Sequence, residues 1–141
     1  MAVVREPISW LKSWFRYSIS TGRLRSELTF PEFALSIANK DAIDGEFINI
    51  RSQFERLSDG RQRRIIVDRL MCFDYLGAEY DALNSDCLSG LGAPLAAANV
   101  SPRKKAATPR EIERLILDHW ARDLDLWKAA RARAEAKYDA A

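Results

Sequence analysis

Large apolar side chains recur at steps of three and four residues along most of this chain, which is the spacing of one face of an α-helix. The first stripe of this kind predicts a helix over residues 8–20. A second helix is predicted over residues 29–39, where the Thr29 hydroxyl and the Glu32 carboxylate have the spacing of a capping box. Helical spacing of this kind favours an all-α fold.

The middle of the chain continues the same pattern. Apolar residues at helical steps predict helices over residues 44–57 and 61–83, and Ser58-Asp59-Gly60 separates them. Gly77 weakens the longer of these two helices. Residues 84–107 differ, because glycine, proline, serine and asparagine stand there among small alanines, which is the composition of a loop or linker.

The end of the chain carries the clearest helix signal. Thr108 and Glu111 again have capping-box spacing, with Pro109 at the first helical position. The stripe that follows predicts a single helix of roughly 30 residues, reaching about Tyr138. Large apolar residues stand only in its first half, so the second half is expected to project from the core or to pack on a partner.

These elements predict a compact bundle of four to five helices, with a long C-terminal helix after a flexible connection. The expected organisation is a helical core over residues 1–83, a linker over 84–107 and the C-terminal helix over 108–141. A weak alternation over residues 23–29 leaves room for one short edge strand.

The composition is that of an ordinary globular protein. The 141 residues are 48% hydrophobic and 30% charged, with 22 bases against 20 acids and a net charge of +2, which excludes disordered and low-complexity classes. No apolar run approaches ~18 residues, so no membrane span is expected. With no secretory signal visible and only Cys72 and Cys87 as thiols, a cytoplasmic protein with both cysteines free is expected.

Few side chains in the sequence have the arrangement that catalysis needs. His119 is the only histidine, and its place on an apolar stripe favours a core or boundary position. Its spacing from Asp123 would suit two metal ligands on one helix, but two such residues are a weak metal signal. We therefore expect no metal, no cofactor and no enzymatic activity.

Charge is distributed unevenly along the chain. Residues 1–25 carry a net charge of +4 and residues 41–59 a net charge of −3, while residues 87–110 contain bases and no acid. Aromatic and basic residues are interleaved along residues 10–17. Surfaces that stack on nucleobases and contact phosphates have this composition. Helical spacing also allows a buried aromatic face beside a solvated basic face, and the sequence leaves both interpretations open.

One segment is similar to a known family. Residues 54–70, FERLSDGRQRRIIVDRL, resemble the start of a sigma-factor region-four-like helix-turn-helix, a pattern shared by some phage antiterminator Q proteins. Those proteins also begin with a tryptophan-containing helix like residues 10–17. The resemblance implies DNA binding and contact with RNA polymerase. Residues 84–92 hold no arginine or lysine. Residues elsewhere in the chain would therefore have to contact the DNA base edges.

Two functions are compatible with these features. The first is a small non-enzymatic regulator of bacterial or phage type that binds nucleic acid, the transcription machinery or both. The second is a protein-binding inhibitor, adaptor or assembly module that makes no nucleic-acid contact. Self-association through the last helix is expected under either. The candidate phosphate contacts are Arg61, Arg63, Arg64, Arg103, Lys104 and Lys105, and the candidate partner contacts are Trp120, Trp127 and Arg131.

Overall fold

The chain forms two compact units, each built around its own apolar core. The computed structural model describes residues 1–43, 45, 48–60, 64–90, 92–95 and 107–139. Unit 1 comprises Met1–Arg5, Gln53–Val100 and Asp125–Ala141, and unit 2 comprises Glu6–Ser52 and Ser101–Leu124. The structure thus replaces the predicted core over residues 1–83 with two cores, both of which use residues from the C-terminal part of the chain.

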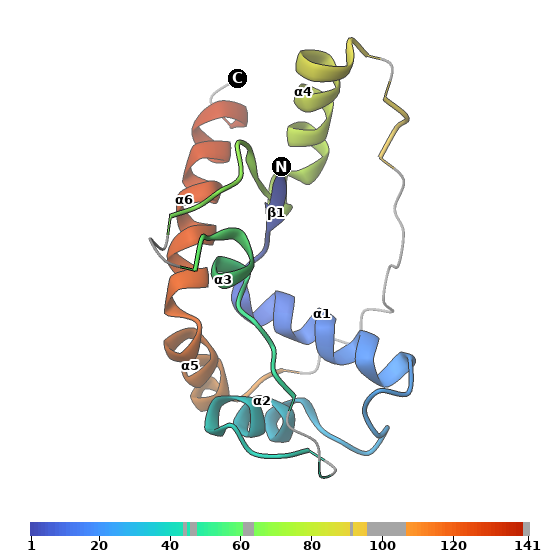
Figure 1. Ribbon diagram of the computed structural model, residues 1–141, viewed down its shortest axis with the longest axis vertical. Helices are drawn as coiled ribbons and strands as arrows, with labels where there is room; N and C mark the ends of the chain where they lie inside the picture. The colour runs from blue at the N-terminus through green and yellow to red at the C-terminus, as the bar shows by residue number, and fades with distance from the viewer. Residues whose placement is uncertain (44, 46–47, 61–63, 91, 96–106, 140–141) are drawn as a thin grey trace. The chain divides into compact units, whose positions relative to one another are not determined.

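Among its described residues, unit 2 contains three helices that contact one another in pairs: α1 (Pro7–Ser20), α2 (Phe30–Asn39) and α5 (Arg110–His119) (Figure 1). The helices predicted over residues 8–20 and 29–39 are confirmed. Aromatic rings fill much of the core: Trp14 stacks on Phe33 with ring centroids 5.5 Å apart, and Trp10 meets Trp120 edge to face at 6.2 Å.

Local hydrogen bonds fix where α1 and α2 begin. The Glu6 carboxylate accepts the N–H groups of Ile8 at 3.1 Å and Ser9 at 2.7 Å, which would otherwise lack partners in the first turn of α1. The predicted capping box of α2 is present: Thr29 N–H donates to Glu32 Oε2 at 2.9 Å, and Glu32 N–H donates to Thr29 Oγ1 at 3.4 Å. Both helix starts are therefore encoded next to the helices themselves.

Thr29→Ala is expected to lower the free energy of unfolding by about 1 kcal/mol, because it removes the capping oxygen of α2. Thr108→Ala is the matched control. The N-terminal cap of α5 is Pro109, which makes no side-chain capping bond, so the loss there should stay within about 0.5 kcal/mol. Urea unfolding of the two variants measures the difference, and equal losses would contradict the capping role.

The same box predicts a pH effect. The hydrogen bonds from Thr29 hold the pKa of Glu32 below its ordinary value of 4.5. A lowered pKa in the folded state stabilises the fold above pH 4.5, and this contribution is lost as the pH falls through the lowered pKa. NMR titration should therefore find the pKa of Glu32 closer to 4.5 in Thr29→Ala than in the parent protein.

Unit 1 combines helices with a small sheet. Strand β1 (Ala2–Val4) pairs in parallel with β2 (Leu70–Cys72), with Ala2 opposite Leu70 and Val4 opposite Cys72. The remaining elements are α3 (Gln53–Leu57), the 3-10 turn η1 (Phe73–Tyr75), α4 (Leu76–Leu88) and α6 (Ala121–Tyr138), of which residues 125–138 belong to this unit. Its core includes Val4, Cys72, Leu126, Ala130 and Ala134.

Side chains bond to backbone groups at the margins of this sheet. Gln53 Oε1 accepts the N–H of Arg5 at 2.9 Å, and Gln53 Nε2 donates to the Arg5 carbonyl at 2.8 Å. On the other strand, the Arg133 guanidinium donates to the carbonyl of Leu70. Parallel strands are usually buried inside larger sheets, and these contacts satisfy groups that neighbouring strands would otherwise take.

The all-α prediction is correct only in its coarser sense. The structure is mainly helical, but it includes the parallel pair β1–β2, which helical spacing did not reveal. The short strand allowed over residues 23–29 is not present. The actual strands are three residues each and lie far apart in the sequence, so neither carries the alternation that identifies a longer strand.

The two helices predicted in the middle are much shorter than expected. Of residues 44–57, only Gln53–Leu57 is helical among the described positions. Of residues 61–83, Arg64–Arg69 is not helical, and α4 begins at Leu76. In place of that helix, Ser58 forms an isolated antiparallel bridge with Ile65.

The linker prediction over residues 84–107 is partly wrong. α4 runs on to Leu88, and the residues after it fold back onto the helix. Tyr80 Oη donates to the Ala93 carbonyl at 2.7 Å, and Gly92 N–H donates to Asn84 Oδ1 at 2.7 Å. Residues 96–106 lie outside the described part of the chain.

A long C-terminal helix is present, but it is α6 rather than one helix from Thr108 to Tyr138. Trp120 separates α5 from α6 with φ −109° and ψ 41°. No glycine or proline marks this point in the sequence. The predicted capping box of Thr108 and Glu111 does not form, since Pro109 is the cap and no side chain bonds there.

Candidate functional site

The best candidate site is a pocket of about 310 Å³ within unit 2. Its volume lies at the small end of the range for ligand pockets, roughly 300–1,000 Å³. Like most such pockets, it combines an apolar and aromatic lining with a few polar groups. The lining comes from three separate segments: Lys12, Phe15 and Arg16 on α1, Leu28–Pro31 at the start of α2, and Ala107 and Thr108 before α5.

The helical spacing of α1 brings the two bases together. Lys12 and Arg16 are four residues apart, so they lie one above the other on a single face of the helix. The Lys12 ammonium lies 5.6 Å from the centroid of the Phe30 ring. Phe30 in turn meets Phe15 edge to face at 5.7 Å. The pocket therefore places one positive charge over the Phe30 ring, and the Phe15 ring packs against Phe30.

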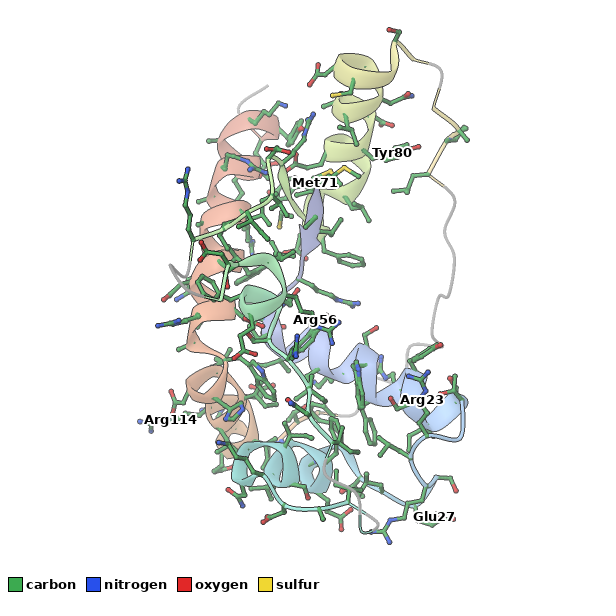
Figure 2. The ribbon with its side chains drawn as sticks, viewed as in Figure 1. Arg23, Glu27, Arg56, Met71, Tyr80 and Arg114 are labelled. Atoms are coloured by element: carbon green, nitrogen blue, oxygen red, sulfur yellow. The ribbon has the colours of Figure 1, made fainter. Side chains whose placement is uncertain are left out.

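The basic character continues past the end of α1. From Pro7 to Ser26 the chain carries four bases and no acid. Arg23 lies over the ring of Tyr17, which is 56% exposed, at 5.8 Å from the centroid. Figure 2 labels Arg23 in the turn after α1. The four bases are Lys12, Arg16, Arg23 and Arg25, and we call them the α1 basic segment.

Two acids follow the α1 basic segment, and each has a hydrogen-bonding partner. The backbone and Ser26 hold the pKa of Glu27 below its ordinary value, and Ser26 Oγ donates to Glu27 Oε1 at 2.9 Å. Glu32 belongs to the capping box of α2. Both are anionic at neutral pH and reduce the local positive charge to a net +2 over residues 12–32 (four bases minus two acids).

The aromatic residues of the Trp10–Tyr17 run divide between core and surface. Trp10, Trp14 and Phe15 pack against the core of unit 2, whereas Tyr17 is exposed. The interpretation of a buried aromatic face beside a basic face therefore holds for most of the run. Phe15 belongs to both environments, because it packs against the core of unit 2 and also lines the pocket.

The phosphate contacts predicted from the sequence are only partly visible. Arg61, Arg63, Arg103, Lys104 and Lys105 lie outside the described residues. Arg64 is described and exposed, and its N–H donates to Asp59 Oδ1 at 3.1 Å, within the turn that follows α3. In the sequence, Arg103–Lys105 stands just before Ala107, which lines the pocket.

The predicted partner contacts occupy different environments. Trp120 is 3% exposed and belongs to the core of unit 2, so its expected role as an exposed anchor is corrected. Trp127 is partly buried, and its Nε1 donates to Asp74 Oδ2 at 3.0 Å within unit 1. Arg131 is exposed, with its Nε 2.7 Å from Glu135 Oε1 and its guanidinium 5.3 Å from the Trp127 ring centroid.

Two groups in unit 1, the Cys72 thiol and the Tyr75 hydroxyl, have raised pKa values. Burial raises the pKa of the Cys72 thiol above its ordinary value of 9.0. The hydrogen bond to Asp139 raises the pKa of Tyr75 to about 12. Both groups are therefore protonated at neutral pH. Among the described residues, no group of three or more histidine, cysteine or acidic side chains could hold a metal ion.

Comparison of this chain with protein-family models, curated proteins and solved structures found no significant match. Over the part of the chain that the structure describes, no helix is both long and apolar enough to cross a membrane.

Sequence reasoning missed most of the pocket. It noted the interleaved basic and aromatic residues of α1, because they are adjacent in the chain, but it left open whether they form a binding surface. It did not identify Thr29, Phe30, Pro31 or Thr108 as site residues, since those positions meet α1 only through the packing of unit 2. Their capping and proline signals relate to helix starts and carry no information about a ligand.

Proposed function

We propose that this protein is a non-enzymatic nucleic-acid-binding protein that contacts phosphates through the α1 basic segment. The observation that carries the proposal is the pocket, whose lining includes Lys12 and Arg16 together with Phe15 and Phe30. Proteins that bind single-stranded nucleic acid combine basic side chains along the phosphate backbone with aromatic rings on which nucleobases stack. The net charge of +2 gives little attraction overall, so affinity depends on this local concentration of bases.

The test is a salt titration of binding to labelled DNA and RNA. Each phosphate contact contributes roughly 0.7–0.9 to the slope of log K against log salt. Replacing Lys12 and Arg16 with alanine should therefore reduce the slope by about 1.5 and weaken binding most at low salt.

Lys128→Ala with Lys137→Ala is the matched control, because it removes the same charge from exposed positions of α6 in unit 1. It should leave the slope within about 0.3 of the parent. No binding near 50 mM salt, or equal effects of the two double variants, would contradict the proposal. Either result would favour the protein-binding alternative.

We extend the same proposal to basic residues that lie outside the described part of the chain. Arg103, Lys104 and Lys105 form an acid-free run that leads into the pocket segment at Ala107. A triple alanine variant at these positions should reduce the salt slope by about 2–3 if all three contact phosphate. The same substitution at Arg61, Arg63 and Arg64 tests the second predicted cluster separately.

A further inference from the structure

The pocket of unit 2 differs from a surface that follows duplex backbone. Phe15 and Lys12 are only partly exposed, and the pocket they line is a hollow between α1 and the residues at the starts of α2 and α5. A protein that reads duplex DNA directly inserts a helix or a β-ribbon into the major groove. Here the basic residues of α1 line a pocket. A pocket can accept a ligand group, whereas it cannot be inserted into a DNA groove.

The residues that line the pocket indicate the chemistry of the ligand group it would accept. Phe15 and Phe30 contribute aromatic side chains to the lining, and Leu28 and Pro31 contribute apolar ones. The Lys12 ammonium is 5.6 Å from the Phe30 ring centroid. A ligand that contacts both the rings and the ammonium therefore needs a flat aromatic ring and an anionic group close to it, and a nucleotide has both.

We infer that the pocket accepts one unstacked base of a single-stranded nucleic acid, with its phosphate on Lys12 and Arg16. This inference rests on the proposed function and narrows its substrate class. In a duplex both faces of each base are covered, and extruding one costs a few kcal/mol. A single strand exposes its bases at much lower cost, so it should bind more tightly than the duplex of the same sequence.

The volume is consistent with a single nucleotide. About 310 Å³ is close to the lower limit for small-ligand pockets and far too small for stacked base pairs. Specificity for base type is expected to be low, because stacking on an aromatic ring tolerates every base. DNA and RNA strands share this chemistry, so both belong in the test.

The experiment measures binding of the full chain to labelled single strands of about 15 nucleotides, DNA and RNA, and to the matching duplexes. The parent protein should bind the single strands about tenfold more tightly than the duplexes. Phe30→Leu keeps the apolar character of the side chain but removes the ring. It should weaken single-strand binding about tenfold and weaken duplex binding much less.

Phe73→Leu is the matched control, since Phe73 is an exposed aromatic residue of unit 1, outside the pocket. It should change neither affinity. Near-UV circular dichroism checks that Phe30→Leu stays folded, and Phe15→Leu provides a second variant if it does not. A free nucleoside monophosphate should compete only at concentrations far above those of the strand.

The outcomes separate this inference from the proposed function. If strands and duplexes bind equally, and the Lys12 and Arg16 double variant weakens both, the proposed phosphate binding is supported. The inference that the pocket accepts an unstacked base is then wrong. If Phe30→Leu weakens both substrates equally, the base pocket is also wrong. A mononucleotide that competes as well as the strand would overturn the inference and assign the pocket to a small free ligand. If neither substrate binds at low salt, both proposals fail.

Discussion

Arg133→Ala is expected to lower the free energy of unfolding of unit 1 by about 2–3 kcal/mol. Arg133 Nη2 lies 2.7 Å from Glu79 Oε1, and the Glu79 side chain is 3% exposed. The same guanidinium donates to the carbonyl of Leu70 in β2. Its removal leaves a buried carboxylate and a strand carbonyl without this partner. The expected loss is below the full cost of breaking a buried pair because the Arg133 side chain is 49% exposed.

Arg131→Ala is the matched control on the same helix. Arg131 forms an ion pair with Glu135, four residues on, and both side chains are more than 40% exposed. Exposed pairs of this kind contribute little to stability, so this variant should lose clearly less than Arg133→Ala. Urea unfolding followed by circular dichroism gives both values. Equal losses would show that burial of Glu79 has no energetic consequence.

A second substitution separates charge from packing. Adding Glu79→Leu to Arg133→Ala removes the buried carboxylate and fills its place with apolar volume. Buried ion pairs replaced in this way are often neutral or stabilising. The double variant should therefore recover most of the stability that Arg133→Ala alone has lost. Failure to recover would assign the loss to the contact with Leu70 instead.

The sequence predicted the parts of the fold whose signals are local. α1 and α2 match the expected helices closely, because apolar spacing, a proline in the first turn and a capping carboxylate all lie within each helix or beside it. The same reasoning noted the basic residues of α1, but it left open whether they form a binding surface. Such elements need no information from distant parts of the chain.

The incorrect predictions concern elements that depend on distant contacts. β1 exists because it pairs with β2, some 68 residues away in register (Ala2 opposite Leu70). The apolar residues from Ile65 to Leu76 happen to fit helical steps, yet β2 and η1 occupy much of this stretch. The division into α5 and α6 falls at Trp120, where the sequence has no helix-breaking residue. The Trp120 ring is instead buried against Trp10.

Phe33→Ala should destabilise the protein even more than Arg133→Ala, with a loss of about 3–5 kcal/mol from unit 2. Phe33 is fully buried. Its ring stacks on Trp14 at 5.5 Å and lies 5.1 Å from Phe15 and 6.5 Å from Phe30, centroid to centroid. Alanine removes all three contacts and leaves a cavity, and its better helix propensity returns only a few tenths of a kcal/mol.

Leu35→Ala, at an exposed position of the same helix, should change stability by no more than about 0.5 kcal/mol. Hydrogen exchange of the α1, α2 and α5 amides reports on unit 2 directly, and a loss below about 1 kcal/mol in Phe33→Ala would contradict the core position of the ring. Phe33 also supports the proposed site, because Phe15 and Phe30 both rest against it. Phe33→Leu, which fills more of that space than alanine, should therefore retain more of the single-strand affinity than Phe33→Ala.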